Sequence, residues 1–586
     1  MHATEERLTA EERRRVYRRT WRVLRPQRKR IALAAVFVAF QAGATLAGPA
    51  IVRYGIDHGV TPRDLSVLNQ AVAVFLAAVA LQYAFGRLVI LAVARIGEGF
   101  LRELRERVFD HLMRLSLEFY DRNRTGVLVA RMTADIESLQ ELVSQGLSMF
   151  IVNMLVLVGA IVIMGVMSWE LALAVLLVVP VLLKASSWFR RESNAAYLQL
   201  REHVGGTLTS FQEGMAGVRV VQAYNQEDVF RRRFRETNER QFETNLHAER
   251  ITAKYSTIIE LTQGGAIALI LCYGGWLTGQ DVITVGTLAA FVLYLQNLFE
   301  PIQQMSQLFN TLQAAGASLQ KLYGLMDEEI EIDERPGAVD LPGRGAMEVD
   351  DVSFRYATGA PVLRHVSLTV APGQRIALVG PTGAGKSTLA KLMVRFYDPV
   401  EGAVRYAGID LRDARLHSLR HRIVVVPQEG FLFGGTIRDN VLIARPDATD
   451  AEIDAAIEAL DLGPRFASFR KGLDTQVQQR GANFSAGERQ LISFVRAALA
   501  DPAVVVLDEA TSSLDPGTEL VVEHALERLM EGRAVIVIAH RLSTAERADL
   551  VAVVQGGALA EIGTHEELVA RGGHYAALFS SWTGSR

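Results

Sequence analysis

The chain contains 586 residues, of which 49% are hydrophobic and 22% are charged. Its formal net charge of −3 argues against bulk attraction to nucleic acid, and its single cysteine, Cys272, excludes an internal disulfide. A chain of this length forms three or four soluble domains, or fewer if part of it spans a membrane. The first half carries long apolar stretches, whereas the second half has the composition of an ordinary soluble α/β protein.

Residues 1–30 are polar and rich in arginine. Arg15 and Arg18 alternate with apolar residues such as Val16 and Trp21, which predicts a cytoplasmic amphipathic helix at the membrane surface. A basic arm that binds nucleic acid is the alternative. The apolar segment that follows directly favours the membrane.

Six apolar stretches follow, and each is long enough to cross about 30 Å of hydrocarbon. Together they predict a transmembrane domain of six helices over residues 31–322. The even number places both termini on one side of the membrane. The stretches lie near residues 31–56, 67–94, 142–167, 169–189, 255–277 and 283–308.

Arginine is concentrated in the two long connections between these stretches, near residues 95–141 and 190–254. In the short connections, Arg63 is the only arginine or lysine. Because basic residues stay on the cytoplasmic side, the long connections and both termini are predicted to be cytoplasmic. The turns near 119–126 and 223–227 have aromatic and charged residues suited to docking on another domain, although a solvated hairpin tip is the alternative.

A short linker is predicted over residues 323–344, because this segment is acidic and then interrupted by proline and glycine. It leads into a second domain over residues 345–586. The boundaries therefore separate an N-terminal helix, a membrane domain, a linker and an α/β domain.

A phosphate-binding loop is the most specific motif in this second domain. Residues 380–388 read Gly-Pro-Thr-Gly-Ala-Gly-Lys-Ser-Thr, between an apolar strand-like run and a helix-like run. Glycines let successive N–H groups point inward at phosphate oxygens, while Lys386 reaches the β- and γ-phosphates and Ser387 can bind Mg²⁺. The predicted nucleotide-binding residues are Gly380, Thr382, Gly383, Ala384, Gly385, Lys386, Ser387 and Thr388.

Two carboxylates end the apolar run Val504–Leu507. In parallel α/β sheets the carboxyl ends of the strands meet ligands. Adjacent residues on a strand point to opposite sides, so we expect Asp508 to hold Mg²⁺ and Glu509 to orient or deprotonate the attacking water. An ordinary strand end is the alternative.

Three further candidates follow strands or begin a helix. His540 follows an apolar run and is expected to sense the γ-phosphate, and Gln428 follows another such run. Ser485 and Gly487 lie where a helix is expected to begin, and a helix N-terminus attracts anions. Tyr356 ends a predicted strand and could stack on a nucleotide base.

These motifs together resemble those of an ATP-binding cassette (ABC) exporter half-transporter of the multidrug or lipid exporter type. The resemblance covers nearly the whole chain. It implies the type IV exporter fold, in which an α-helical transmembrane domain of six long helices is fused to an α/β P-loop nucleotide-binding domain. The two cytoplasmic turns would then be coupling helices.

The resemblance also assigns roles to single residues. It implies that Tyr356 stacks on adenine, that Gln428 binds Mg²⁺ and senses the membrane domain, and that His540 is the switch histidine. It implies that the signature segment 484–488 contacts ATP held by a partner chain, and that residues 513–515 form the loop that crosses the dimer.

The signature departs from the family pattern Leu-Ser-Gly-Gly-Gln. It reads Phe-Ser-Ala-Gly-Glu, so Glu488 places negative charge near the nucleotide, and Gln479 replaces a glutamate of a nearby family motif. Both segments would face the partner subunit. This favours a heterodimer with a related half-transporter, with a homodimer as the alternative.

The sequence therefore predicts an ATPase that couples hydrolysis of Mg²⁺-bound ATP to movement of hydrophobic or amphipathic small molecules or lipids. The resemblance places it as a multi-pass protein of the bacterial inner membrane, with its ATP-binding domain in the cytoplasm. It is expected to act on no nucleic acid. Import instead of export, a soluble ATP-driven switch, and an ATP-gated regulator or channel are the alternatives.

Overall fold

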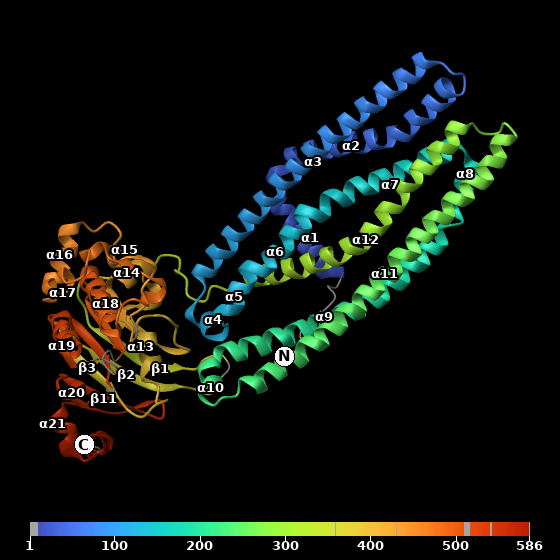
Figure 1. Cartoon of the computed structure of the whole chain (residues 1–586). Coiled ribbons are helices and arrows are strands. Elements are labelled where there is room, and N and C mark those ends of the chain that lie inside the picture. Colours follow the sequence, from blue (N-terminus) through green and yellow to red (C-terminus); the bar gives the residue numbers. More distant parts are fainter. Residues whose placement is uncertain (1–9, 358, 429, 509–515, 540–541, 585–586) are drawn as a thin grey trace. The chain divides into compact units, whose positions relative to one another are not determined.

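We describe the protein in a computed structural model that covers residues 10–357, 359–428, 430–508, 516–539 and 542–584. The chain folds into two compact units (Figure 1). The first contains Met1–Met113 and Thr125–Glu328, and the second contains Arg114–Arg124 and Glu329–Arg586.

The first unit is helical. It begins with α1 (Ala10–Leu24) and a short 3₁₀ turn, so the predicted N-terminal helix is present. The longer helices that follow are α2 (Arg28–Gly55), α3 (Leu65–Arg114), α7 (Leu147–Met167), α9 (Val179–Ala216), α11 (Glu227–Gly279) and α12 (Val285–Met326). The shorter ones are α5 (Thr125–Ala130), α6 (Ile136–Glu141), α8 (Trp169–Leu176) and α10 (Val218–Ala223).

Each predicted apolar stretch lies in this helical set. Within the described residues, five helical stretches are long and apolar enough to cross a membrane, and the sixth predicted stretch lies in α12. The five are Arg14–Val60, Leu65–Arg114, Thr125–Met167, Trp169–Ala216 and Glu227–Gly279. Because α3, α9 and α11 extend well beyond an apolar stretch, the helices continue through the long connections, as predicted.

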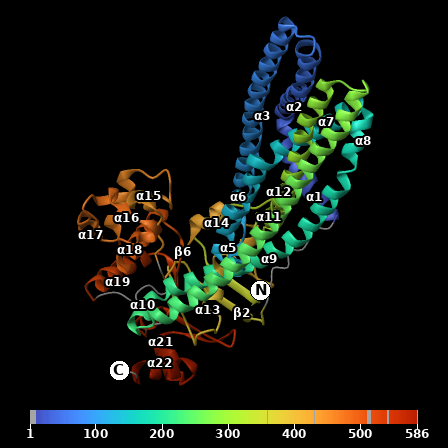
Figure 2. The ribbon, with the colours of Figure 1, turned by 45° about the vertical axis from the view of Figure 1, so that its right-hand side comes forward.

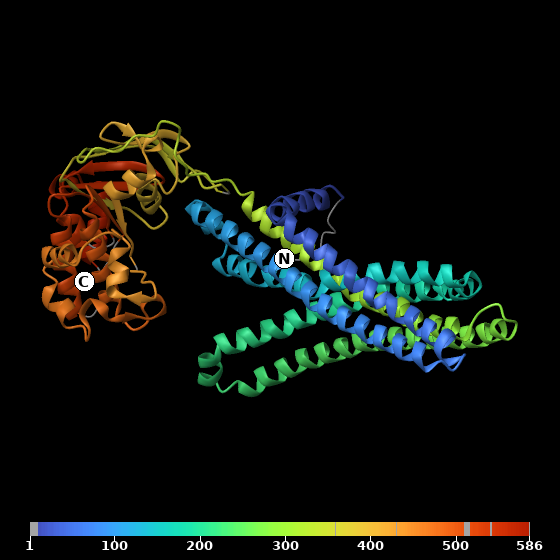
Figure 3. The same ribbon diagram turned by 90° about the horizontal axis from the view of Figure 1, so that it is seen from above.

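The helices pack through alanine, aliphatic and aromatic residues. α9 and α11 lie side by side over much of their length, which Figures 2 and 3 show from two directions. The core of the bundle includes Ile259, Phe291 and Tyr294, all fully buried. The Tyr294 hydroxyl donates a 2.6 Å hydrogen bond to the carbonyl of Leu46, which joins α12 to α2.

The second unit contains two larger sheets. The first is antiparallel, in the order β2-β1-β4-β5, and the second has the order β12-β11-β3-β10-β9-β6. In the second sheet β11, β3, β10, β9 and β6 are parallel, and β12 is the antiparallel edge. The strands of the first sheet are β1 (Met347–Phe354), β2 (Leu363–Val370), β4 (Glu401–Tyr406) and β5 (Ile409–Asp410). Those of the second are β3 (Arg375–Val379), β6 (Ile423–Val426), β9 (Val504–Asp508), β10 (Ala534–Ile538), β11 (Leu550–Gln555) and β12 (Ala558–Gly563).

Helices cover these sheets. The first group is α13 (Lys386–Met393), α14 (Leu416–Arg422), α15 (Ile437–Leu442), α16 (Asp450–Ala459), α17 (Gly463–Ala467) and α18 (Ala486–Ala500). The second is α19 (Pro516–Met530), α20 (Leu542–Glu546), α21 (His565–Arg571) and α22 (His574–Gly584). A two-stranded sheet, β7 (Gly435–Thr436) with β8 (Gln476–Val477), lies beside α15.

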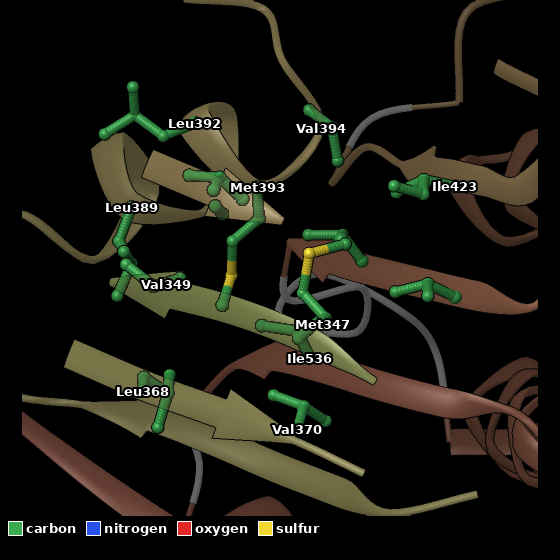
Figure 4. Packing of buried hydrophobic residues seen from close by; sticks show 14 of the residues in the cluster. Met347, Val349, Leu368, Val370, Leu389, Leu392, Met393, Val394, Ile423 and Ile536 are labelled. Atoms are coloured by element: carbon green, nitrogen blue, oxygen red, sulfur yellow. The ribbon is translucent and has the colours of Figure 1, made fainter. Parts of the chain in front are cut away.

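Two hydrophobic clusters hold the unit together. One lies between the sheets and α13, and Figure 4 shows Met347, Val349, Leu368 and Met393 in it. The other packs α15 to α19 around residues such as Phe494. The strand that leads into the phosphate-binding loop is thus held by the first cluster. The signature segment and α18 are held by the second cluster.

The second unit also includes a short helix from the predicted 119–126 turn. This helix, α4 (Leu117–Arg122), packs Leu117 against the first cluster. The Ser116 hydroxyl donates a 2.6 Å hydrogen bond to the Glu331 carboxylate. The other predicted turn joins α10 to α11 and leaves the Tyr224 side chain 73% exposed.

Candidate active site

Four strand ends converge at one edge of the larger sheet. Ile538 of β10 pairs with both Leu378 of β3 and Asp508 of β9, so these strands are in register at their carboxyl ends. The phosphate-binding loop begins two residues after Leu378. Val426 of β6 pairs with Leu507, and Gln428 follows two residues later. The sheet therefore gathers the loop, Asp508 and Gln428 at its carboxyl edge, the edge at which parallel α/β sheets meet ligands.

The loop has the backbone that its glycines permit. Gly380, Gly383 and Gly385 have φ angles of 143°, 82° and 108°, a region that side chains rarely adopt. A Cβ on Gly380 would also lie 2.1 Å from the carbonyl oxygen of Val554, whereas one on Gly383 would meet nothing within 4 Å. Gly380 is thus required by close packing, and Gly383 is required by its backbone conformation alone.

Lys386 is folded against this loop. Its side chain is nearly buried, and Nζ donates hydrogen bonds to the carbonyls of Gly380 (2.7 Å) and Pro381 (3.0 Å). Burial lowers the pKa of Lys386, and the nearby Asp508 carboxylate partly offsets this by raising it. The ammonium lies where the loop would cradle phosphate, so it can exchange its carbonyl partners for phosphate oxygens.

Tyr356 reaches the same loop. It follows β1 by two residues, and its hydroxyl lies 3.0 Å from Oγ1 of Thr388. Its ring contacts those of Phe354 and Tyr397 edge-on, at centroid distances of 5.0 and 5.4 Å. The structure therefore brings Tyr356 next to the phosphate-binding loop, and packing against two aromatic rings holds its own ring in place.

Oxygen ligands suited to Mg²⁺ come from Ser387, Gln428 and Asp508. Ser387 and Gln428 are exposed and Asp508 is half-buried, on a helix start and two neighbouring strand ends. Hydroxyl, amide and carboxylate oxygens fit Mg²⁺, which usually takes its other ligands from water and substrate phosphates. In the described part of the chain, His, Cys, Asp and Glu form no group of three that would hold a metal alone.

The predicted catalytic pair falls outside the described residues. In the sequence, Glu509 directly follows Asp508, and His540 directly follows Ala539. The crossing loop 513–515 is also outside the described part. Their roles stay predictions.

Ser485 begins α18 and forms a capping box. Its hydroxyl accepts the N–H of Glu488, and its own N–H donates 2.7 Å to Oε2 of Glu488. Oε1 of the same carboxylate accepts a 2.8 Å hydrogen bond from Arg465. Gly487 is buried in the first turn. The expected negative charge at Glu488 is therefore paired.

Sequence reasoning missed two residues of this region, Arg465 and Tyr397. Arg465 pairs with Glu488, and Tyr397 donates a 2.5 Å hydrogen bond to Asp121 of α4. The two members of the second pair are 276 residues apart, and only the fold brings them together. Arg465 lies 23 residues before Glu488, with other basic residues in between, so no local pattern marks it as the partner.

The second unit combines a phosphate-binding loop, an acidic strand end and a capped helix on a parallel sheet, and the first unit supplies long apolar helices. These features define a membrane-bound P-loop nucleoside triphosphatase. Two family models match the chain: the ABC transporter transmembrane region over residues 31–302, and the ABC transporter model over residues 363–512. The chain belongs to the ABC transporter family. It is an integral membrane protein with an ATP-binding, ATP-hydrolysing domain, and the predicted fold class is confirmed.

Relatives and a solved structure match over nearly the full length. The chain is 35% identical to the uncharacterized ABC transporter ATP-binding protein YknV of Bacillus subtilis, covering 95% of this chain and 93% of that one. It is 33% identical to an ATP-dependent lipid A-core flippase of Syntrophus aciditrophicus, covering 96% and 94%. A bacterial Atm1-family ABC exporter with ATP bound superposes with a TM-score of 0.77 at 29% identity, covering 94% and 98%.

Proposed function

We propose that this chain is a half-transporter that couples ATP hydrolysis to the export of hydrophobic or amphipathic molecules or lipids from the inner membrane. The observation that carries the proposal is the register of β3, β10 and β9, which sets the phosphate-binding loop beside Asp508. The similarity to a lipid A-core flippase and to an exporter structure supports the cargo class and the direction.

The proposed organisation keeps the four segments expected from the sequence. Residues 1–30 form the surface helix, 31–322 the membrane domain, 323–344 the linker and 345–586 the ATP-binding domain. The start of β1 at Met347 and the end of α12 at Met326 support the last two boundaries.

The proposed chemistry assigns one task to each group. Tyr356 stacks on adenine, the N–H groups of residues 380–388 and the Lys386 ammonium bind phosphates, and Ser387, Gln428 and Asp508 would hold Mg²⁺. Bound Mg²⁺ neutralises charge on the β- and γ-phosphates. Glu509 accepts a proton from the attacking water, and His540 senses the γ-phosphate by donating a hydrogen bond to it. Because ATP binds the closed dimer better than the open one, binding closes the dimer and hydrolysis reopens it.

The apolar helices supply a surface for such cargo. A pocket of about 630 Å³ lies between α2 and α3, and its walls are almost entirely apolar. The lining residues include Ala39, Phe40, Gly43, Ala47, Val74 and Ala78. Most of these side chains are small, so they leave room for a hydrocarbon chain or ring, and they offer it no strong polar partner. This lining supports a hydrophobic or lipid cargo.

Two such chains, or this chain and a related one, would form the working unit. Ser485 and Gly487 of one subunit would complete the ATP site of the other. Gln479 and Glu488 depart from the family pattern on this shared face, which favours a related partner over a second copy. An ATP-gated regulator or channel remains the second candidate, and vesicle uptake would separate it, because only a pump accumulates cargo against a gradient.

Mg-ATP hydrolysis by the purified chain in lipid nanodiscs tests the proposal, with Glu509→Gln as the control. We expect hydrolysis that falls by on the order of a thousandfold in Glu509→Gln, while ATP still binds. If the chain alone is silent, co-expression with a second half-transporter should restore activity. Near-wild-type hydrolysis in Glu509→Gln would remove the assigned base.

A further inference from the structure

Glu488 is the one acidic residue in the signature segment, and both of its oxygens are engaged. Oε2 accepts the backbone N–H of Ser485 at 2.7 Å, and Oε1 accepts a guanidinium N–H of Arg465 at 2.8 Å. The Glu488 side chain is 19% exposed and that of Arg465 is 40% exposed. The carboxylate is thus held in one orientation by two donors.

A second departure from the family signature contacts the same segment. Phe484 stands where the family pattern has leucine, and its ring contacts Phe469 edge-on at 5.7 Å. Phe469 in turn contacts Phe466 at 5.6 Å and lies under the Arg465 guanidinium at 5.8 Å. The short segment 465–469 therefore contacts two of the three unusual signature residues, Phe484 and Glu488.

We propose that Arg465 is a positioning residue for the signature: it neutralises Glu488 and fixes its carboxylate, so that Ser485 can serve an ATP molecule held by the partner subunit. This inference rests on the proposed function, because it needs a signature that meets ATP. The expectation drawn from sequence alone placed a negative charge near the nucleotide and named no partner for it.

The physical reason is electrostatic. A helix N-terminus attracts phosphate through its free N–H groups and its partial positive charge. An unpaired carboxylate in the first turn would oppose a polyanion such as ATP. A guanidinium held by an aromatic ring and a carboxylate cancels that charge and still leaves the Ser485 hydroxyl at the helix start.

The test measures ATP hydrolysis against ATP concentration in nanodiscs, for the chain alone or with its partner half-transporter if the chain alone is silent. Arg465→Ala should raise KM for ATP about fivefold, with kcat within about twofold, the size expected for a partly exposed charge pair. Arg465→Lys should keep KM near wild type. The double variant Arg465→Ala/Glu488→Gln should restore it, because no charge remains to neutralise.

Two controls separate charge from folding. Arg470→Ala removes an exposed arginine five residues away and should leave KM unchanged. The KM difference between Arg465→Ala and wild type should shrink as salt is raised from about 0.05 M to about 0.5 M, because screening weakens charge repulsion. A purely structural loss would not respond to salt in this way.

The outcomes distinguish a failure of this inference from a failure of the proposed function on which it rests. An active wild type with unchanged KM in Arg465→Ala overturns the inference alone, as does a raised KM that Glu488→Gln does not rescue. A wild type that hydrolyses no ATP, alone or with a partner, overturns the proposed function and this inference with it. With the expected result, the charge of Glu488 would no longer favour a heterodimer. Of the two residues on which that argument rested, only Gln479 would still favour it.

Discussion

The contact between α4 and the ATP-binding unit yields a quantitative prediction at Tyr397. Its hydroxyl donates 2.5 Å to Asp121, and its side chain is 3% exposed. Burial raises the pKa of Tyr397, and the hydrogen bond to Asp121 raises it further, so the hydroxyl stays protonated as a donor. Tyr397→Phe removes this donor and keeps the ring, which contacts Phe354 and Tyr356.

The magnitude follows from what remains. A hydrogen bond to a charged group contributes about 1.5–3 kcal/mol. Lys391 still approaches the Asp121 carboxylate at 3.3 Å, and that carboxylate is 47% exposed, so water can replace the lost donor. The lower figure therefore applies. A loss of about 1.5 kcal/mol raises the fraction of undocked α4 about tenfold.

Amide hydrogen exchange in the full chain measures this opening. We expect exchange in Leu117–Arg122 to quicken about tenfold in Tyr397→Phe. Tyr575→Phe is the matched control, because Tyr575 is also buried and its hydroxyl lies 2.7 Å from Nδ1 of His565. Exchange of α4 within twofold of wild type would refute the reasoning and show that Leu117 and the Ser116–Glu331 bond suffice.

Two further predictions concern the phosphate-binding loop. Because burial lowers the pKa of Lys386 below its ordinary value of 10.5, ATP affinity should be full at neutral pH and decline at a lower alkaline pH than an ordinary lysine would give. Lys386→Arg should move this decline upward and Lys386→Ala should weaken binding at every pH; equal pH limits for lysine and arginine would contradict the assignment. Gly380→Ala should abolish ATP binding or folding of the domain, because its Cβ would lie 2.1 Å from the Val554 carbonyl, whereas Gly383→Ala should cost only about 1 kcal/mol of stability from its left-handed backbone; equal unfolding temperatures would refute that distinction.

Local motifs explain what could be predicted. The loop at 380–388 carries its own turn chemistry in its glycines, and Val504–Asp508 reads as a buried strand that ends in a carboxylate. The apolar stretches likewise reveal their helices, because each must satisfy its backbone within itself in a membrane. Each of these features is determined by residues that are neighbours in the sequence, so it can be predicted from a single sequence.

Contacts between distant segments explain what could not be predicted. The pairing of Tyr397 with Asp121 depends on the tertiary fold, and neither residue is unusual in its own stretch. The charge at Glu488 was visible, but its neutralisation by Arg465 depends on how α17 packs against α18. Sequence reasoning thus found Glu488 but not the arginine that pairs with it.

The length of α11 has a mechanical consequence. With 53 residues, this helix is about 80 Å long at a rise of about 1.5 Å per residue, more than twice the thickness of the hydrocarbon layer. A rod of that length converts a tilt of only about 5° into a displacement of about 7 Å at its far end. A small rearrangement at one end of α11 can therefore produce a displacement of several ångströms at its other end.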